Sequence, residues 1–203
     1  EFDITRWHSD TTQDCWGSFI YARDRDENWL WSAAFQPLLR PERRYAVNFA
    51  ADRATFRRRD AEIETVTEII VSPETDAEIR RVTLSNFSRR SRRVELTSYI
   101  ELALAPHASD RAHPAFSKLF VQTEALSAPR SLVAWRRPRS PQDKPIWAAH
   151  CAIGGDSSDR FEFETDRAKF VGRGRSARDP AGVQATLSCS QGAVLDPIFS
   201  IRR

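Results

Sequence analysis

The chain has 203 residues, of which 40% are hydrophobic and 29% charged, and its 31 basic and 28 acidic residues leave a formal net charge of +3. This balance is typical of a soluble globular protein with one large domain, and no apolar run reaches the ~18 residues that a membrane-spanning helix needs. Because basic and acidic residues are interleaved along most of the chain, the composition argues against a nucleic-acid-binding protein.

The cysteines indicate the redox compartment of the chain, and its first residues indicate whether it is part of a longer polypeptide. Cys15, Cys151 and Cys189 are far apart and odd in number, which matches neither a disulfide framework nor a paired-cysteine zinc site. We therefore expect reduced thiols in a cytoplasmic or otherwise reducing compartment. The chain begins at Glu1, contains no methionine and has no apolar leader, so we expect it to be a piece of a longer polypeptide.

Alternating hydrophobic residues predict four short strands in the first sixty residues, at 17–24, 29–35, 45–50 and 54–58. The first two are separated by the polar turn Asp24-Arg-Asp-Glu-Asn28, so they are expected to form a β-hairpin. The second strand of this hairpin places Trp29 and Trp31 on one face.

Three longer strands are predicted next, at residues 62–71, 78–84 and 94–104. The connections are turns that are too short for a crossover helix, so an antiparallel meander is expected. In the last strand Leu96, Ile100 and Leu104 share one parity, which predicts one buried face. The turn before it, residues 86–93, carries four arginines, which we interpret as solvated turn residues.

The second half of the chain continues the pattern of short strands. Residues 105–116 contain two prolines and two histidines without periodicity and predict a long loop. Further strands are predicted at residues 119–124, 131–136, 146–153, 161–165 and 193–202. Helix should be confined to short pieces such as residues 166–171. About a dozen short strands favour an all-β protein built as a large antiparallel β-sandwich with few short helices.

Tryptophans are the first candidates for a binding role, because an indole packs well on the flat face of a sugar ring. The six are Trp7, Trp16, Trp29, Trp31, Trp135 and Trp147. Tryptophan in a β-sandwich is more commonly a core residue than a binding residue. Trp7, in a polar segment beside His8 and Asp10, is the one we expect to be most exposed.

Titratable clusters carry a weaker signal. His107, Asp110 and His113 lie within seven residues and could bind a metal or act as acid and base. Their spacing matches no standard metal signature, and His113 precedes Pro114, which favours a structural turn. A glycosidase pair could be drawn from Asp10, Asp14, Glu101 and Glu124, but sequence cannot place two of them at the required separation. We expect no metal and no other cofactor.

Several longer motifs resemble a known family. The segments that carry the resemblance are Thr5-Arg-Trp7, 14–21 (DCWGSFIY), 71–74 (VSPE), 80–83 (RRVT), 95–99 (ELTSY), 113–117 (HPAFS), 120–124 (FVQTE) and 136–140 (RRPRS). Together they look like the amino-terminal β-domain of the disaccharide phosphorylases of glycoside hydrolase family 94, formerly glycosyltransferase family 36. They resemble in particular the corresponding domain of the cyclic β-1,2-glucan synthases, and the resemblance runs from about Thr5 to Arg202.

This resemblance implies a β-supersandwich similar to the galactose mutarotase fold. It also implies that the parent polypeptide is anchored in the bacterial inner membrane, with this domain in the cytoplasm, and carries an (α/α)6 phosphorylase-like barrel. In the family the barrel holds the general acid and the phosphate site, while the β-domain supports it and contributes to subunit contacts. No catalytic residue is therefore carried over, and a homodimer is a possible partner arrangement.

Three functions follow as hypotheses. The first is a non-catalytic carbohydrate-binding domain that guides a glucan or oligosaccharide and packs on the barrel. Its binding residues would come from Trp7, Asp10, Trp31, His113 and Gln122. The second is a purely structural domain without affinity for sugar, which predicts a sizeable exposed apolar patch. The third is a stand-alone enzyme of mutarotase or lyase type, which would need the 107–113 cluster to line a cleft.

Overall fold

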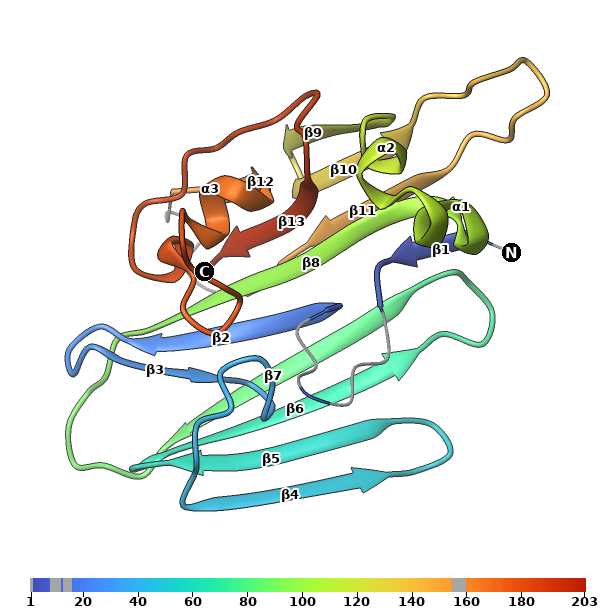
Figure 1. Ribbon diagram of the computed structural model, residues 1–203. Coiled ribbons are helices and arrows are strands. Elements are labelled where there is room, and N and C mark those ends of the chain that lie inside the picture. The colour runs from blue at the N-terminus through green and yellow to red at the C-terminus, as the bar shows by residue number, and fades with distance from the viewer. Residues whose placement is uncertain (1, 8–11, 13–15, 155–159) are drawn as a thin grey trace. The chain divides into compact units, whose positions relative to one another are not determined.

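The computed structural model describes residues 2–7, 12, 16–154 and 160–203. The polypeptide, drawn in Figure 1, divides into two compact units. Unit one comprises Glu1–Ser18 and Leu96–Arg203, and unit two comprises Phe19–Glu95. Strands that pair within the described residues do so antiparallel wherever their register is defined. The predicted all-β architecture is confirmed.

Unit two contains a hairpin and a four-stranded sheet. The hairpin is formed by β2 (Ser18–Asp24) and β3 (Trp29–Ser32). The sheet contains, in spatial order, β4 (Arg44–Phe49), β5 (Ala54–Asp60), β6 (Ile63–Val71) and β7 (Glu78–Asn86). Its strand β6 is rich in β-branched residues, which fit a pleated surface. Spatial order follows chain order, as expected for hairpin connections.

Buried polar contacts hold the hairpin on one face of the four-stranded sheet of unit two. The indole Nε1 of Trp31 donates to Thr65 Oγ1 at 2.9 Å, and Thr67 Oγ1 donates to the carbonyl of Ala33 at 3.0 Å. The fully buried Arg58 forms an ion pair with Asp60, with Nε 2.6 Å from Oδ2. Buried polar groups need partners, so these contacts specify how the hairpin lies on the sheet.

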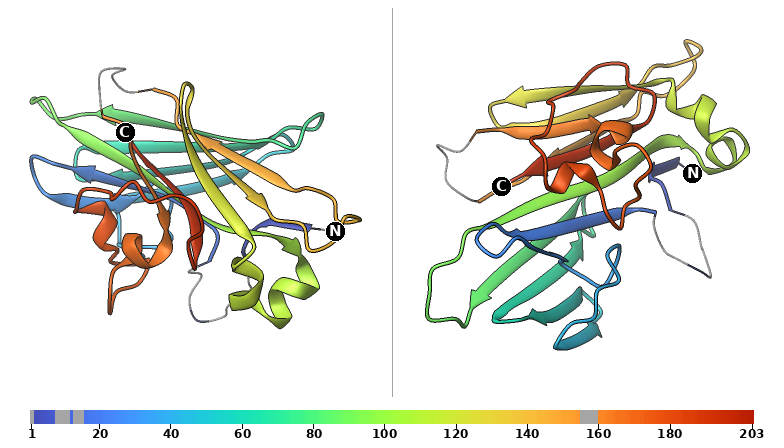
Figure 2. Two further views of the ribbon diagram at one scale, coloured as in Figure 1. Left: turned by 90° about the horizontal axis from the view of Figure 1, so that it is seen from above. Right: turned by 60° about the vertical axis from the view of Figure 1, so that its left-hand side comes forward.

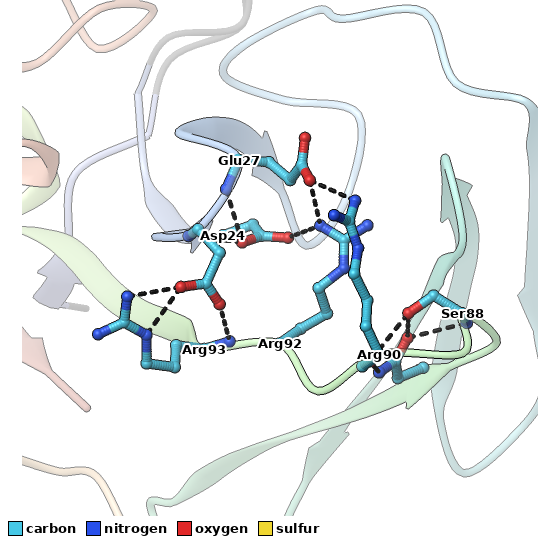
Figure 3. A network of polar contacts seen from close by, with 8 residues as sticks. Asp24, Glu27, Ser88, Arg90, Arg92 and Arg93 are labelled. Atoms are coloured by element: carbon cyan, nitrogen blue, oxygen red, sulfur yellow. Dashed lines mark hydrogen bonds and ion pairs between the residues drawn. The ribbon is translucent and has the colours of Figure 1, made fainter.

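The arginine-rich turn at residues 86–93 is mostly exposed, as predicted, but three of its arginines are also paired with acidic side chains. Arg92 Nη1 lies 2.5 Å from Asp24 Oδ2, and only 7% of the Arg92 side chain is exposed. Arg90 pairs with Glu27, and Arg93 donates to Asp26 Oδ1 from Nε at 2.8 Å. Figure 3 shows these arginines reaching toward the acidic hairpin turn. The sequence hides the pairing because the two turns are more than sixty residues apart.

These exposed pairs predict how stability changes with pH. Hydrogen bonds from the Arg93 side chain and backbone lower the pKa of Asp26 below its ordinary value. The folded pKa therefore lies below the unfolded pKa. The stabilisation is present above the ordinary carboxyl pKa of about 4 and is lost as the pH falls through the folded pKa.

Replacing Asp26 with asparagine should thus lower the urea midpoint at pH 7, and the difference from the unmodified chain should shrink below about pH 4. Urea titrations at a series of pH values check this. Asp76→Asn, at another polar turn of unit two, is the control. A difference that stays constant down to pH 2 would contradict the pairing of Asp26 with Arg93.

Unit one is a sandwich of two sheets. In the first sheet β8 (Val94–Pro106) pairs with β13 (Pro197–Arg202) and β1 (Phe2–Thr5), and β12 (Glu162–Asp166) pairs with β13. The second sheet contains β9 (Val121–Ser127), β10 (Arg130–Arg136) and β11 (Trp147–Cys151). Figure 2 shows the strands of the second sheet, yellow to orange, beside β13 in red. The buried core includes Leu102, Leu104, Leu132, Phe199 and Ile201.

The long strand β8 departs from its prediction in two ways. It pairs with β13 and β1 rather than extending the meander of β6 and β7, because alternation does not identify a strand's partner. Both of its faces are buried, since Tyr99 and Glu101, on the polar parity, are also inaccessible to solvent. Helix α3 (Arg167–Val171) covers the second face. Its Phe170 packs on Tyr99, with the two ring centroids 5.1 Å apart.

The predicted loop at residues 105–116 is largely helical. It forms α1 (His107–Ala112) and the start of α2 (Pro114–Lys118), both too short to show a helical period. Pro114 opens α2, a position where its missing N–H costs no hydrogen bond. The expected short helix at residues 166–171 is confirmed as α3, and a 3-10 turn η1 (Ala181–Val183) follows. None of the helices in the described residues is long and apolar enough to cross a membrane.

Candidate functional site

The outer face of the second sheet of unit one carries a stacked aromatic pair, Trp135 and Trp147, of which Trp147 is exposed. On β10, Leu132 and Ala134 belong to the core, so the alternating neighbours Val133 and Trp135 point to the other face. Strand register aligns Trp135 with Gln122 of β9 on one side and with Trp147 of β11 on the other. We call Gln122, Trp135 and Trp147 the tryptophan row.

The geometry of the tryptophan row suits a flat ligand. The two indole rings stack with centroids 5.1 Å apart and an interplanar angle of 27°. Such a pair contributes about 0.5–1.5 kcal/mol beyond burial and holds both rings in a defined orientation. Trp147 is 59% exposed and lies on β11, the outer strand in the order of the sheet. An indole face at a sheet edge is therefore available to an apolar ring surface.

Polar groups stand beside this aromatic surface. Gln122 offers an amide at one end of the row, and the next row places Glu124 of β9 opposite Val133 of β10. An amide and a carboxylate provide donors and acceptors for hydroxyl groups. Binding sites for small molecules commonly combine an apolar surface with a few polar groups that fix orientation. The face thus has the chemistry to hold a sugar.

A second feature lies around α1, α2 and the connection from β10 to β11. A cavity of roughly 290 Å³ is lined by Ala108, Ser109, His113, Phe116, Ser117 and Arg139. Arg139 lies over the rings of Phe116 and Phe120, 5.1 and 4.4 Å from their centroids. Burial lowers the pKa of nearby Arg136, whose Nη1 donates to the carbonyl of Ser117 at 2.9 Å. These contacts fix the connection against α2.

The five predicted binding residues have different outcomes. Trp7 is 61% exposed, as expected, and Gln122 belongs to the tryptophan row. His113 borders the 290 Å³ cavity. The expectation for Trp31 was wrong, because its indole is completely buried against β6 and no sugar can reach it. Asp10 lies outside the described residues. In the part of the chain that the structure describes, no hydrogen bond or ring contact joins Trp7, His113 and Gln122.

The cluster of His107, Asp110 and His113 is divided among separate contacts. Asp110 is buried and accepts two hydrogen bonds from Arg6, at 2.8 and 2.5 Å. His107 Nδ1 lies 2.7 Å from Asp3 Oδ2. Among the described residues, no three His, Cys, Asp or Glu side chains are grouped so as to hold a metal ion. Asp110 is thus engaged in a structural ion pair, which weakens the hypothesis of a stand-alone mutarotase- or lyase-like enzyme.

The expectation that most tryptophans are core residues was also wrong. Trp31 alone among the six has no exposed surface in the described residues, whereas Trp7, Trp29 and Trp147 are each more than two-fifths exposed. The pair of Trp135 and Trp147 escaped the sequence analysis as a binding site. A signal for this pair was present in the sequence. The proline-containing connection at residues 137–146 joins two predicted strands, so their ends, which carry Trp135 and Trp147, come together.

Comparisons with known proteins bear on this geometry. The family model described as glycosyl hydrolase 94, supersandwich domain, matches residues 1–203. The chain is 39% identical over 203 residues to the cyclic beta-(1,2)-glucan synthase NdvB of Rhizobium meliloti (strain 1021), covering 98% of this chain and 7% of that protein. It is 27% identical over 123 residues to the N,N'-diacetylchitobiose phosphorylase of Vibrio furnissii, covering 60% of this chain and 15% of that enzyme.

Proposed function

Because the chain belongs to the glycosyl hydrolase 94 supersandwich family, we propose that it is a non-catalytic carbohydrate-binding domain of a longer glucan-processing polypeptide. The observation that carries this proposal is the tryptophan row, in which the exposed Trp147 stacks on Trp135 beside an amide. The chain spans only 7% of the length of the glucan synthase that it resembles. The catalytic machinery of the parent polypeptide is therefore assigned to its other parts.

The tryptophan row would hold a glucan by two kinds of contact. The free face of Trp147 packs on the C–H face of a glucosyl ring, and Gln122 and Glu124 exchange hydrogen bonds with its hydroxyl groups. One relative is a cyclic beta-(1,2)-glucan synthase, so a β-1,2-glucan is the proposed ligand. A short stretch of a growing chain held in this way is guided toward the catalytic barrel of the same polypeptide.

An exposed apolar patch on the four-stranded sheet of unit two supports the scaffolding role. Val47, Phe49 and Val71 lie on the same face of the four-stranded sheet as Arg58 but farther along the strands. Their side chains are not covered there and are 41%, 75% and 66% exposed. An apolar patch of this kind is typical of a surface that another part of a protein covers. We assign it to packing against the (α/α)6 barrel. If no glucan binds, a purely structural domain without sugar affinity is the remaining role.

The two compact units act together in this proposal, because one family model covers residues 1–203. The domain lies on the cytoplasmic side of a parent protein anchored in the bacterial inner membrane. Contacts between copies through this domain would make the parent a homodimer. Sedimentation of the isolated chain over a range of concentrations tests that last assignment.

Replacing Trp147 with alanine tests the binding role. A central tryptophan in an interface typically contributes about 2 kcal/mol or more, so the affinity for linear β-1,2-glucan should fall about 30-fold. Titrations of the 203-residue chain followed by calorimetry measure the change. Trp29→Ala, which removes an exposed tryptophan from unit two, is the matched control and should leave the affinity unchanged.

Two results would overturn the assignment. Equal affinity of Trp147→Ala and the unmodified chain would remove the tryptophan row as the site. Absence of any binding of linear or cyclic glucan at millimolar concentration would reject the carbohydrate-binding role and leave the structural one.

A further inference from the structure

A cleft separate from the tryptophan row lies elsewhere in unit one. Its volume is roughly 340 Å³, and it is lined by Arg6, Trp16, Pro114, Lys118, Leu195 and Asp196. These residues come from the chain after β1, the segment before β2, α2, and the segment before β13. The volume is at the small end of the ~300–1,000 Å³ range of ligand sites, so a ligand of one or two rings fits.

The charges around the cleft are balanced. Lys118 Nζ lies 2.5 Å from Asp196 Oδ1, and Arg6 is paired with Asp110. Arg167, whose guanidinium lies 5.9 Å from the ring centroid of Trp16, is paired with Glu101 at 2.9 Å. Each of these three cations therefore has an acidic partner. A phosphate or other anion would gain little net attraction here, whereas a neutral polar ligand meets no electrostatic penalty.

Among the residues that the structure describes, one nitrogen of Arg6 has no hydrogen-bond partner. Nε and Nη2 of Arg6 donate to Asp110, but Nη1 is buried and makes no hydrogen bond, although only 2% of the residue is exposed. Leaving a buried donor unsatisfied costs about 1–3 kcal/mol, and more for a charged group. An oxygen acceptor of a bound ligand would remove that cost. Arg6 is one of the residues that line the cleft.

The protonation state of Arg6 favours this role. Burial by itself would lower the pKa of Arg6, but the hydrogen bond and charge of Asp110 outweigh burial and raise it. Arg6 therefore stays protonated, and a donor, at neutral pH. The apolar side of the cleft is supplied by Trp16, Pro114 and Leu195, and an indole offers a broad apolar surface to a ring.

We propose that this cleft binds a terminal hexose unit of a neutral oligosaccharide, with Arg6 Nη1 donating to a hydroxyl oxygen and Trp16 against the ring. The inference does not depend on the tryptophan row, because the two sites share no residue. Lys118 and Asp196, already paired with each other, supply a donor and an acceptor for a neighbouring hydroxyl. The cleft is thus a site for a chain end rather than for the middle of a glucan.

The test fills the cleft without removing any packing. Ala115, an exposed residue of α2, borders the cleft, so Ala115→Trp would occupy it. The probes are glucose, the β-1,2-linked glucose disaccharide, glucose 1-phosphate and inorganic phosphate. Binding is followed through the indole N–H signals of 15N-labelled chain. We expect both neutral sugars to shift the Trp16 signal, and Ala115→Trp to weaken binding at least tenfold.

Controls separate this site from the tryptophan row. Ala112→Trp, at an exposed position of α1 that borders the 290 Å³ cavity, should bind the disaccharide as the unmodified chain does. Trp147→Ala should leave the Trp16 shifts unchanged even if it abolishes binding of long glucans. Trp16→Ala should reduce disaccharide affinity at least tenfold, and circular dichroism confirms that each variant is folded.

Three outcomes would overturn the inference. The first is the absence of any shift of the Trp16 signal at 50 mM sugar, about the weakest affinity worth detecting. The second is tighter binding of inorganic phosphate or glucose 1-phosphate than of glucose, which would make the cleft an anion site. The third is undiminished disaccharide binding by folded Ala115→Trp.

Discussion

Replacing Asp60 with alanine is expected to destabilise unit two by about 3–5 kcal/mol, because the buried charge of Arg58 then has no ion-pair partner. Arg58 donates to both carboxylate oxygens of Asp60, at 2.6 and 2.7 Å, and neither side chain is more than 1% exposed. Its third nitrogen donates to the carbonyl of Ala34 at 2.6 Å. Without Asp60, that contact cannot compensate the buried charge.

Urea denaturation followed by circular dichroism measures this loss. Glu64→Ala is the matched control, because it removes an acid from the same sheet whose partner Arg57, at 3.0 Å, is 58% exposed. An exposed pair contributes only about 0–1 kcal/mol, so this variant should remain close to the unmodified chain. If both variants lose the same stability, burial is not what gives the Arg58–Asp60 pair its effect.

The replacement of Asp110 with alanine should destabilise unit one by a similar amount, about 3–5 kcal/mol. Arg6 and Asp110 are 2% and 3% exposed, and their closest nitrogen and oxygen atoms are 2.5 Å apart. The pair joins the chain after β1 to α1, two segments that are 104 residues apart. Removing the carboxylate leaves a buried guanidinium without the anion to which it is hydrogen-bonded.

A double variant shows whether the stability lost by Asp110→Ala comes from the unpaired charge of Arg6 or from lost packing. Arg6→Met with Asp110→Ala removes both charges, so it should recover much of the stability that Asp110→Ala alone loses. Urea midpoints of the two single variants, the double variant and the unmodified chain complete the cycle. Additive losses would show that the two residues are not energetically coupled.

Local pattern located most of the strands. The strands predicted at 78–84, 94–104 and 131–136 appear as β7, β8 and β10, and the short helix predicted at 166–171 appears as α3. Alternation and β-branched content belong to the segment itself, so they can be interpreted without knowing its neighbours. The resemblance to glycoside hydrolase family 94 is likewise confirmed over residues 1–203. Linear motifs were sufficient for that assignment.

Side-chain surroundings were harder to predict. Trp31 and Trp147 both lie on strands with similar neighbours in sequence, but one is fully buried and the other is 59% exposed. The difference depends on which face each strand presents and on what covers it. The helices α1 and α2 were missed because five or six residues are too few to show a period.

The all-β class, the position of most strands and the family were therefore predictable from local patterns and linear motifs. Other features depend on contacts between distant segments: the partners of β8, the burial of its polar face, the pairing of the arginine turn with the hairpin, and the alignment of Gln122, Trp135 and Trp147. Strand period is a local property of the backbone. Burial and partnership arise only when segments distant in sequence meet, and no local pattern records which segments those are.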